Sequence, residues 1–168
     1  MSTEQEGPEA VRRATDACLR LLAVRARSRH ELKLALERKG FSAQVQDEVL
    51  EKLKGYGYVD DASFARERAA SLLRRGRFGP QAVLQRLQAH GLGGKEAREA
   101  LAAASGAVEF DALATARQVL ERRGLLGRPL EPKERARAGR LLHSRGFSED
   151  VIQRLLGEPS LDPSGLDD

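Results

Sequence analysis

The stretch SRHELKLALERKGFS at residues 28–42 recurs twice in related form, as GPQAVLQRLQAHGLG at 79–93 and within PKERARAGRLLHSRGFS at 132–148. In each copy a leucine stands four residues before a glycine, and an apolar residue follows the glycine directly. Further apolar residues stand eight before and ten after the same glycine. The glycines on which the copies align are Gly40, Gly91 and Gly146. Agreement at four apolar positions in three copies indicates a tandem repeat.

Each copy has the pattern of a helix, a glycine break and a second helix. Apolar residues four positions apart lie on one helical face, as Leu32 and Leu36 do. Ser28 with Glu31 predicts a capping box, whereas Pro80 and Pro132 suit a first helical turn. We expect each aligned glycine to end its helix in the left-handed conformation, with the apolar residue after it folding back.

A further helix is predicted ahead of each pair, over about residues 9–25, 61–74 and 110–122. The expected fold is therefore all-α, an elongated array of three tandem three-helix repeats with about nine helices and no strand. The expected division is an acidic disordered tail at 1–8, repeats at 9–55, 56–105 and 106–157, and a second acidic disordered tail at 158–168.

Repeats of this size are too small to bury a sizeable core alone, so we expect neighbours to contact one another in a long, curved array. The connection at 124–131 is longer than its counterparts in the other repeats, which is typical of a hinge or a contact loop.

The charge of the chain is distributed unevenly. The net charge is +4, but residues 1–9 and 157–168 hold seven acids and no base. Without those seven acids, the middle carries 29 basic against 18 acidic residues, a net +11. A body this basic attracts nucleic acid or an acidic protein surface, although solvated helix faces of an arginine-rich chain would give the same composition.

Several function classes lack their usual signals. No apolar run approaches the ~20 residues of a membrane span, and no export signal is apparent, so a cytoplasmic protein is expected. The single cysteine, Cys18, lies among leucines and is interpreted as a small buried hydrophobe. Asp60 and Asp61 are interpreted as helix caps rather than as a catalytic or metal-binding pair. The histidines have no partner at ligand spacing, so we expect no enzyme, no metal and no cofactor.

Basic residues recur at matching turns, and we expect them to form a row along one edge of the array. Arginine binds phosphate and carboxylate equally well, so this row predicts an acidic partner without choosing between DNA and protein. The last helix of each repeat offers few side chains for reading bases, which disfavours sequence-specific binding and leaves phosphate contact open. The turns hold Arg25, Arg27 and Arg29; Arg74, Arg75 and Arg77; and Arg122, Arg123 and Arg128.

The second repeat resembles a known family. The runs GYVDD at 57–61, FAR at 64–66 and RGRFGP at 75–80, followed by Leu87 and GL at 91–92, are similar to the hallmark of RecX recombination regulators. Residues 21–41 resemble the opening repeat of that family, and the whole resemblance covers about residues 14–157.

The resemblance implies a nine-helix fold and a role in DNA repair and the SOS response. RecX proteins bind the RecA–DNA filament, typically within its groove, and suppress the ATPase, strand-exchange and co-protease activities of RecA. We expect a monomer with this partner; the alternative is a nonspecific DNA-binding protein with tandem helix-turn-helix units, and weak direct DNA binding is left open.

Two sets of residues follow from this comparison. The first matches the family motif and is expected to be mainly structural, although Tyr56 and Tyr58 would also serve as exposed aromatic anchors. It comprises Gly57, Tyr58, Asp60, Asp61, Phe64, Gly79 and Pro80. The second set is expected to contact the partner and comprises Arg29, Lys33, Arg74, Arg75, Arg77 and Arg86.

Overall fold

The computed structural model describes residues 7–157, and within this range the chain forms nine α-helices and no strand. They fall into three groups of three, here called the first, second and third modules. The first holds α1 (Pro8–Val24), α2 (Arg29–Arg38) and α3 (Ala43–Gly55); the second α4 (Asp61–Arg74), α5 (Pro80–Ala89) and α6 (Gly94–Ala107); the third α7 (Ala112–Arg122), α8 (Pro132–Ser144) and α9 (Glu149–Leu156). The predicted all-α array of three-helix repeats is confirmed.

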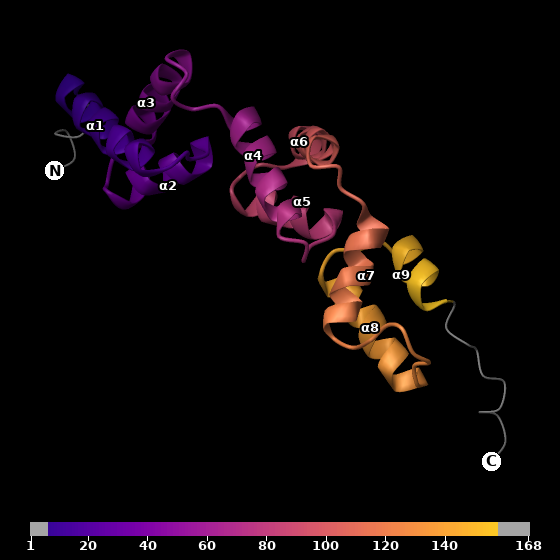
Figure 1. Ribbon diagram of the computed structural model, residues 1–168. Helices are drawn as coiled ribbons and strands as arrows, with labels where there is room; N and C mark the ends of the chain where they lie inside the picture. The colour runs from indigo at the N-terminus through magenta and orange to yellow at the C-terminus, as the bar shows by residue number, and fades with distance from the viewer. Residues whose placement is uncertain (1–6, 158–168) are drawn as a thin grey trace.

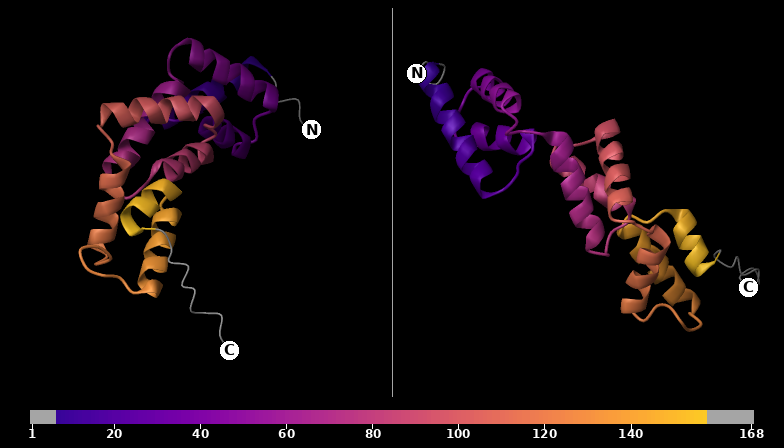
Figure 2. Two further views of the ribbon diagram at one scale, coloured as in Figure 1. Left: turned by 90° about the vertical axis from the view of Figure 1, so that its right-hand side faces the viewer. Right: turned by 45° about the horizontal axis from the view of Figure 1, so that its top comes forward.

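The modules follow one another along an elongated molecule, with the first and third at opposite ends (Figure 1). A second direction of view shows that the array also bends, so that the third module turns away from the line of the first two (Figure 2). Each module is separated from the next by a short extended segment, after α3 and after α6.

The helix ends follow the local sequence signals closely. Side chains of Ser42, Asp60 and Ser148 accept hydrogen bonds from backbone N–H groups in the first turns of α3, α4 and α9. The aligned glycines take positive φ angles of 84°, 75° and 83°, which confirms their predicted role as left-handed helix stops. Those glycines are Gly40, Gly91 and Gly146.

Three local predictions need correction. The helix α1 begins at Pro8 rather than at residue 9, because proline suits the first turn. The helix α7 begins at Ala112 rather than at 110, because Asp111 caps it by accepting from the N–H of Ala114. The predicted capping box at Ser28 is only half formed, since the Glu31 carboxylate binds Arg25 and His90 instead of returning to the backbone of Ser28. Of the expected tails at 1–8 and 158–168, residues 1–6 and 158–168 lie outside the described residues.

Each module has an apolar core of its own. In the first, Cys18, Leu32 and Leu36 are fully buried, and in the third Leu120 and Leu142 are. The second module is built on small side chains: α4 and α6 form its most extensive contact, and alanines let their backbones approach closely. The buried alanines of these two helices are Ala65, Ala69, Ala70, Ala97, Ala100 and Ala104. No apolar cluster of the described residues joins two modules, so contact between modules must come from other groups.

The long connection between α7 and α8 is held against α8 by an ion pair and a hydrogen bond. Arg128 and Glu134 form an ion pair of 2.7 Å, and the Glu134 carboxylate also accepts from the N–H of Glu131. These contacts lower the pKa of Glu134 to about 2, with the hydrogen bond from Arg128 as the main cause. Leu125, at the start of the connection, is buried in the third core.

Candidate partner-binding surface

The first and second modules meet where α2 begins and α5 ends. The hydroxyl of Ser28 donates a 2.8 Å hydrogen bond to the carbonyl of His90, and Nδ1 of His90 lies 2.6 Å from the carboxylate of Glu31. The backbone N–H of Arg29 donates to the Asp61 side chain at 2.8 Å. This first junction is therefore polar, with one aromatic contact where the rings of Phe64 and His90 meet edge to face at 5.5 Å.

The second and third modules meet at the equivalent place, where α5 begins and α8 ends. The N–H of Gly79 donates a 2.7 Å hydrogen bond to the carbonyl of Arg145, and the N–H of Gln81 donates to the carbonyl of Gly146 at 3.1 Å. The two backbones are so close that a Cβ added to Gly146 would lie 2.1 Å from the backbone nitrogen of Ala82. This second junction requires glycine on both sides, since a Cβ at Gly79 would lie 2.5 Å from the carbonyl oxygen of Gly146.

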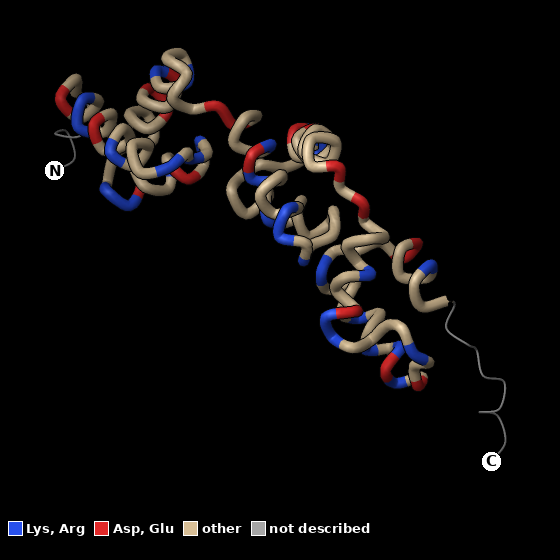
Figure 3. Tube along the Cα trace, in the orientation of Figure 1, with Lys and Arg blue, Asp and Glu red and all other residues tan. Residues whose placement is uncertain are grey.

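A cleft of about 480 Å³ lies beside the second junction, here called the arginine cleft. Its lining combines the α4–α5 connection of the second module with the ends of α7 and α8 of the third, which lie next to each other in Figure 3. Five of its lining residues are arginines and none is acidic. The lining residues are Arg75, Arg77, Val119, Arg122, Arg123 and Arg145.

None of the five arginines forms an ion pair with another described residue. Arg122 and Arg145 each reach one backbone carbonyl across the junction, that of Gly76 and that of Arg77, at 3.4 Å. These long bonds use a small part of the donor capacity of two guanidinium groups. The cleft therefore presents uncompensated positive charge to solvent.

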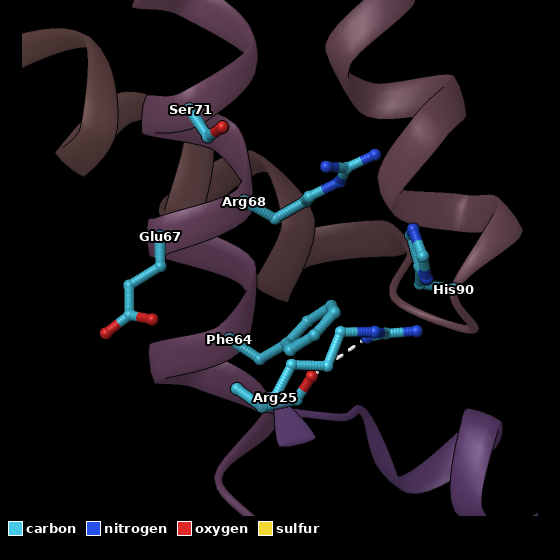
Figure 4. Close-up of a pocket in the computed structure, with 7 residues that line it drawn as sticks. Arg25, Phe64, Glu67, Arg68, Ser71 and His90 are labelled. Carbon is cyan, nitrogen blue, oxygen red and sulfur yellow. Dashed lines mark hydrogen bonds between the residues drawn. The ribbon is translucent and has the colours of Figure 1, made fainter. Parts of the chain in front are cut away.

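The cleft at the equivalent place beside the first junction has a mixed lining. Arg25, Phe64 and His90 cluster at one end of it, and Arg68 lies further along α4 (Figure 4). Glu67 also lines this cleft, and Arg25 is paired with Glu31 at 2.8 Å. Acidic groups therefore offset much of the positive charge at the first junction.

The six predicted contact residues, five arginines and one lysine, do not all gather at one place. Arg75 and Arg77 line the arginine cleft, whereas Arg74 is exposed in the last turn of α4 outside that lining. Arg86 stacks on the ring of Phe78 at 4.2 Å. Arg29 is 2.9 Å from Glu51, and Lys33 is 3.5 Å from Asp47, so both pair with acids of α3.

Sequence reasoning missed Arg145 as a site candidate. Arg145 is the C-cap of α8, and no role is predicted for it from the sequence. The signal that would have found it is the repeat itself, because Arg145 and His90 are both helix C-caps that border a cleft.

The family-motif residues form contacts at the two junctions or shape the start of the second module. Asp60 caps α4, Asp61 binds the backbone of Arg29, and Phe64 packs on His90. Gly57 has a φ of +81° in the connection before α4, where Tyr58 is 57% exposed and Tyr56 is 68% exposed. Gly79 and Pro80 begin α5 at the second junction.

The part of the chain that the structure describes also bears on metal binding, on membrane-spanning helices and on the single cysteine. Residues 7–157 contain no group of three or more His, Cys, Asp or Glu side chains placed to hold a metal ion. No helix in that range is both long and apolar enough to cross a bilayer. Cys18 is fully buried, and burial raises the pKa of its thiol to about 11, so it packs as a small hydrophobe as predicted.

Comparison with known proteins agrees with the module boundaries. The family model of the first three-helix domain of RecX matches residues 14–53, that of the second matches 60–101, and that of the third matches 109–156. The chain belongs to the RecX family. Among RecX relatives, Regulatory protein RecX of Halorhodospira halophila (strain DSM 244 / SL1) is 38% identical over 153 residues, which cover 91% of this chain and 90% of the relative.

Other RecX proteins extend the comparison. Regulatory protein RecX of Ectopseudomonas mendocina (strain ymp) is 34% identical over 151 residues, covering 90% of this chain and 95% of the relative. The crystal structure of RecX from Lactobacillus salivarius superimposes with a TM-score of 0.72 at 18% identity, covering 87% of this chain and 94% of that one. The fold is thus that of a RecX protein, and the relatives are regulatory proteins.

Proposed function

We propose that this chain binds the filament that RecA forms on DNA and inhibits its ATPase, strand-exchange and co-protease activities, and so affects DNA repair and the SOS response. The observation that carries the proposal is the arginine cleft, set within an elongated three-module body. Membership in a family of regulatory proteins supports it. The proposal places a monomer in the cytoplasm, where that filament forms.

The shape suits a helical polymer better than a compact target. A filament presents the same surfaces at regular intervals, and three modules in a row can meet successive copies of them. Because the modules are held together, several modest contacts combine into one strong attachment. Inhibition then needs no reactive group on this chain, since an occupied groove blocks the movements of the filament.

The decisive measurement is the DNA-dependent ATPase of RecA in the presence of this protein. We expect strong inhibition at amounts well below one molecule per RecA subunit, because one elongated molecule spans several subunits. Undiminished ATP hydrolysis at an excess of this protein would show that it does not act on RecA.

The competing function is nonspecific DNA binding by tandem helix-turn-helix units. It predicts tight binding to naked DNA with a steep dependence on salt, and inhibition only when this protein covers the DNA. The helix α6, with the sequence GKEAREALAAASGA, offers few side chains for reading bases, which disfavours sequence-specific binding. Inhibition of RecA at amounts too small to cover the DNA is therefore the result that separates the filament proposal from nonspecific DNA binding.

A further inference from the structure

We propose that the arginine cleft binds the phosphodiester backbone of DNA, and that its occupation ties the second and third modules together. This inference goes beyond the proposed function, because it requires no RecA and can be tested without it. It rests on the position, the charge and the lining of the cleft.

The positive charge of the cleft exceeds what its own helix ends can offset. Single arginines often end helices, because the C-terminal carbonyls carry partial negative charge. Three helices end at this cleft, α4, α7 and α8, and together they contribute roughly −1.5 elementary charges. Against this stand five guanidinium groups with no acidic neighbour in the lining. A helix-end preference therefore explains Arg75, Arg122, Arg123 and Arg145 separately, but it leaves Arg77 and the gathered charge unexplained.

The equivalent cleft beside the first junction shows that such charge is not a necessity of the fold. There Glu67 lies in the lining and Glu31 pairs with both Arg25 and His90. The same architecture thus accommodates acids at one junction and lacks them at the other. At the second junction, the arginines that form no ion pair with another described residue can therefore bind an anion that does not belong to this chain.

The lining favours a phosphodiester backbone over an acidic protein surface. Protein interfaces usually anchor on an aromatic or aliphatic side chain that fills a pocket. Here the one apolar lining residue, Val119, is only 6% exposed and offers no such anchor. Phosphate oxygens need only charge and donors, and guanidinium forks supply both. No aromatic ring lines the cleft to stack on a base, so we expect binding without sequence preference.

Phosphate binding in the arginine cleft would also strengthen the contact between the second and third modules. Arg75 and Arg77 belong to the second module, whereas Arg122, Arg123 and Arg145 belong to the third. These like charges repel one another across a junction held by few hydrogen bonds. A phosphate bridging the two sides removes that repulsion and stiffens the array at this point.

The first test measures binding of the full-length protein to fluorescein-labelled oligonucleotides of mixed sequence, single- and double-stranded, over a range of salt. The variant Arg75→Gln/Arg123→Gln removes two exposed arginines that make no side-chain hydrogen bond or ion pair with other described residues. We expect at least a tenfold loss of affinity for the form that binds, and a log–log salt slope shallower by roughly 2.

The matched control is Arg12→Gln/Arg20→Gln, which removes two exposed arginines from α1 at the far end of the array. Equal losses in both double variants would mean that net charge alone governs binding, and would overturn the site. Failure of the native protein to bind either oligonucleotide would do the same. Polyglutamate bound as tightly as DNA, and equally weakened by Arg75→Gln/Arg123→Gln, would reassign the cleft to acidic protein.

The second test reports the stiffening directly through hydrogen exchange measured by NMR. The N–H groups of Gly79 and Gln81 donate across the second junction, whereas that of Arg29 donates across the first. Adding DNA should slow exchange at Gly79 and Gln81 severalfold and leave Arg29 unchanged. Unchanged exchange at Gly79 and Gln81 in DNA-saturated protein would refute the bridging role.

Discussion

The hydroxyl of Ser28 donates to the carbonyl of His90, a residue 62 positions later in the chain, at 2.8 Å. Ser28 is the N-cap of α2, and His90 is the C-cap of α5. At the second junction the same two positions meet again, where Gly79, the N-cap of α5, donates to Arg145, the C-cap of α8. A hydroxyl at one junction and a backbone N–H at the other thus perform the same task.

This relationship places the middle helices in a head-to-tail series. The start of α2 meets the end of α5, and the start of α5 meets the end of α8. Free N–H groups at a helix start then face free carbonyls at a helix end, so each junction satisfies groups that would otherwise need water. The opposite partial charges of the two ends also attract. Modules can therefore be joined without a shared apolar core.

The first prediction concerns the glycines at the second junction. Gly146→Ala would place a Cβ 2.1 Å from the backbone nitrogen of Ala82, at a φ of +83°. We expect a loss of roughly 1–2 kcal/mol from the backbone conformation and roughly 1–3 kcal/mol more from the clash. Urea unfolding followed by circular dichroism measures the sum.

The control for this prediction is Gly124→Ala. Gly124 also has a positive φ, +66°, but a Cβ there would meet no atom within 4 Å. Gly124→Ala should therefore lose only the stability that the backbone conformation costs, without the further loss from a clash. Equal destabilisation by the two substitutions would contradict the close approach at the second junction.

The second prediction concerns the polar contacts of the first junction. Glu31→Gln removes the charge that binds His90 and Arg25. Because Ser28, Leu32 and the core beneath them are unchanged, we expect the first module to stay folded while the junction opens more often. Faster exchange of the Arg29 amide, which donates to Asp61, would report this opening. An amide of the α2 interior, such as that of Leu36, should exchange at its native rate.

The fold was predictable because its signals are local. Leucine spacing, serine and aspartate caps and the glycine stops each act within a few residues, and the repeat presents them three times. The junctions between modules were not predictable from the sequence. Ser28 and His90 are far apart in the chain, and their contact uses a backbone carbonyl, which every residue carries.

The candidate surface was predictable in part for the same reason. Arginines at matching turns indicated a basic edge, and Arg75 and Arg77 do line the arginine cleft. The ion pairs of Arg29 and Lys33 could not be predicted from the sequence, because their partners Glu51 and Asp47 lie on another helix. Arg145 joins the cleft only through the docking of one module on the next.

The separation of the cores gives a third prediction. Cys18 is fully buried with a pKa of about 11, so a thiol reagent at neutral pH should react only when the first module opens. Leu50→Ala empties space in the same core and should destabilise that module by roughly 2–5 kcal/mol, which accelerates labelling more than tenfold. The kinetics are followed by absorbance with an aromatic disulfide.

The matched control for labelling is Leu142→Ala. Leu142 is as deeply buried as Leu50 but belongs to the third core. Because no apolar cluster joins the modules, its loss should leave the labelling rate of Cys18 within about twofold of the native value. A large acceleration would mean that the modules unfold as one cooperative unit.

The fourth prediction is a pH dependence at the α7–α8 connection. The pKa of Glu134 is lowered to about 2, mainly by the hydrogen bond from Arg128. A lowered pKa means that the folded state favours the charged carboxylate, so the contribution of this pair is present above the ordinary value of 4.5 and is lost as the pH falls toward 2. In a carboxyl-carbon NMR titration, Arg128→Gln should raise the midpoint of Glu134, and an unchanged midpoint would exclude the ion pair in solution.

The last prediction joins the arginine-rich edge to the proposed inhibition of RecA. Reversing three exposed arginines, Arg74→Glu, Arg75→Glu and Arg77→Glu, places negative charge where the filament is proposed to bind. Repulsion then replaces attraction, and inhibition of the RecA ATPase should disappear while the helical content stays native. The control with the same change of charge reverses Arg12, Arg20 and Arg38, which are exposed on the first module. Inhibition that survives reversal at the α4–α5 turn, or that is lost equally in the control, would move the contact surface elsewhere on the array.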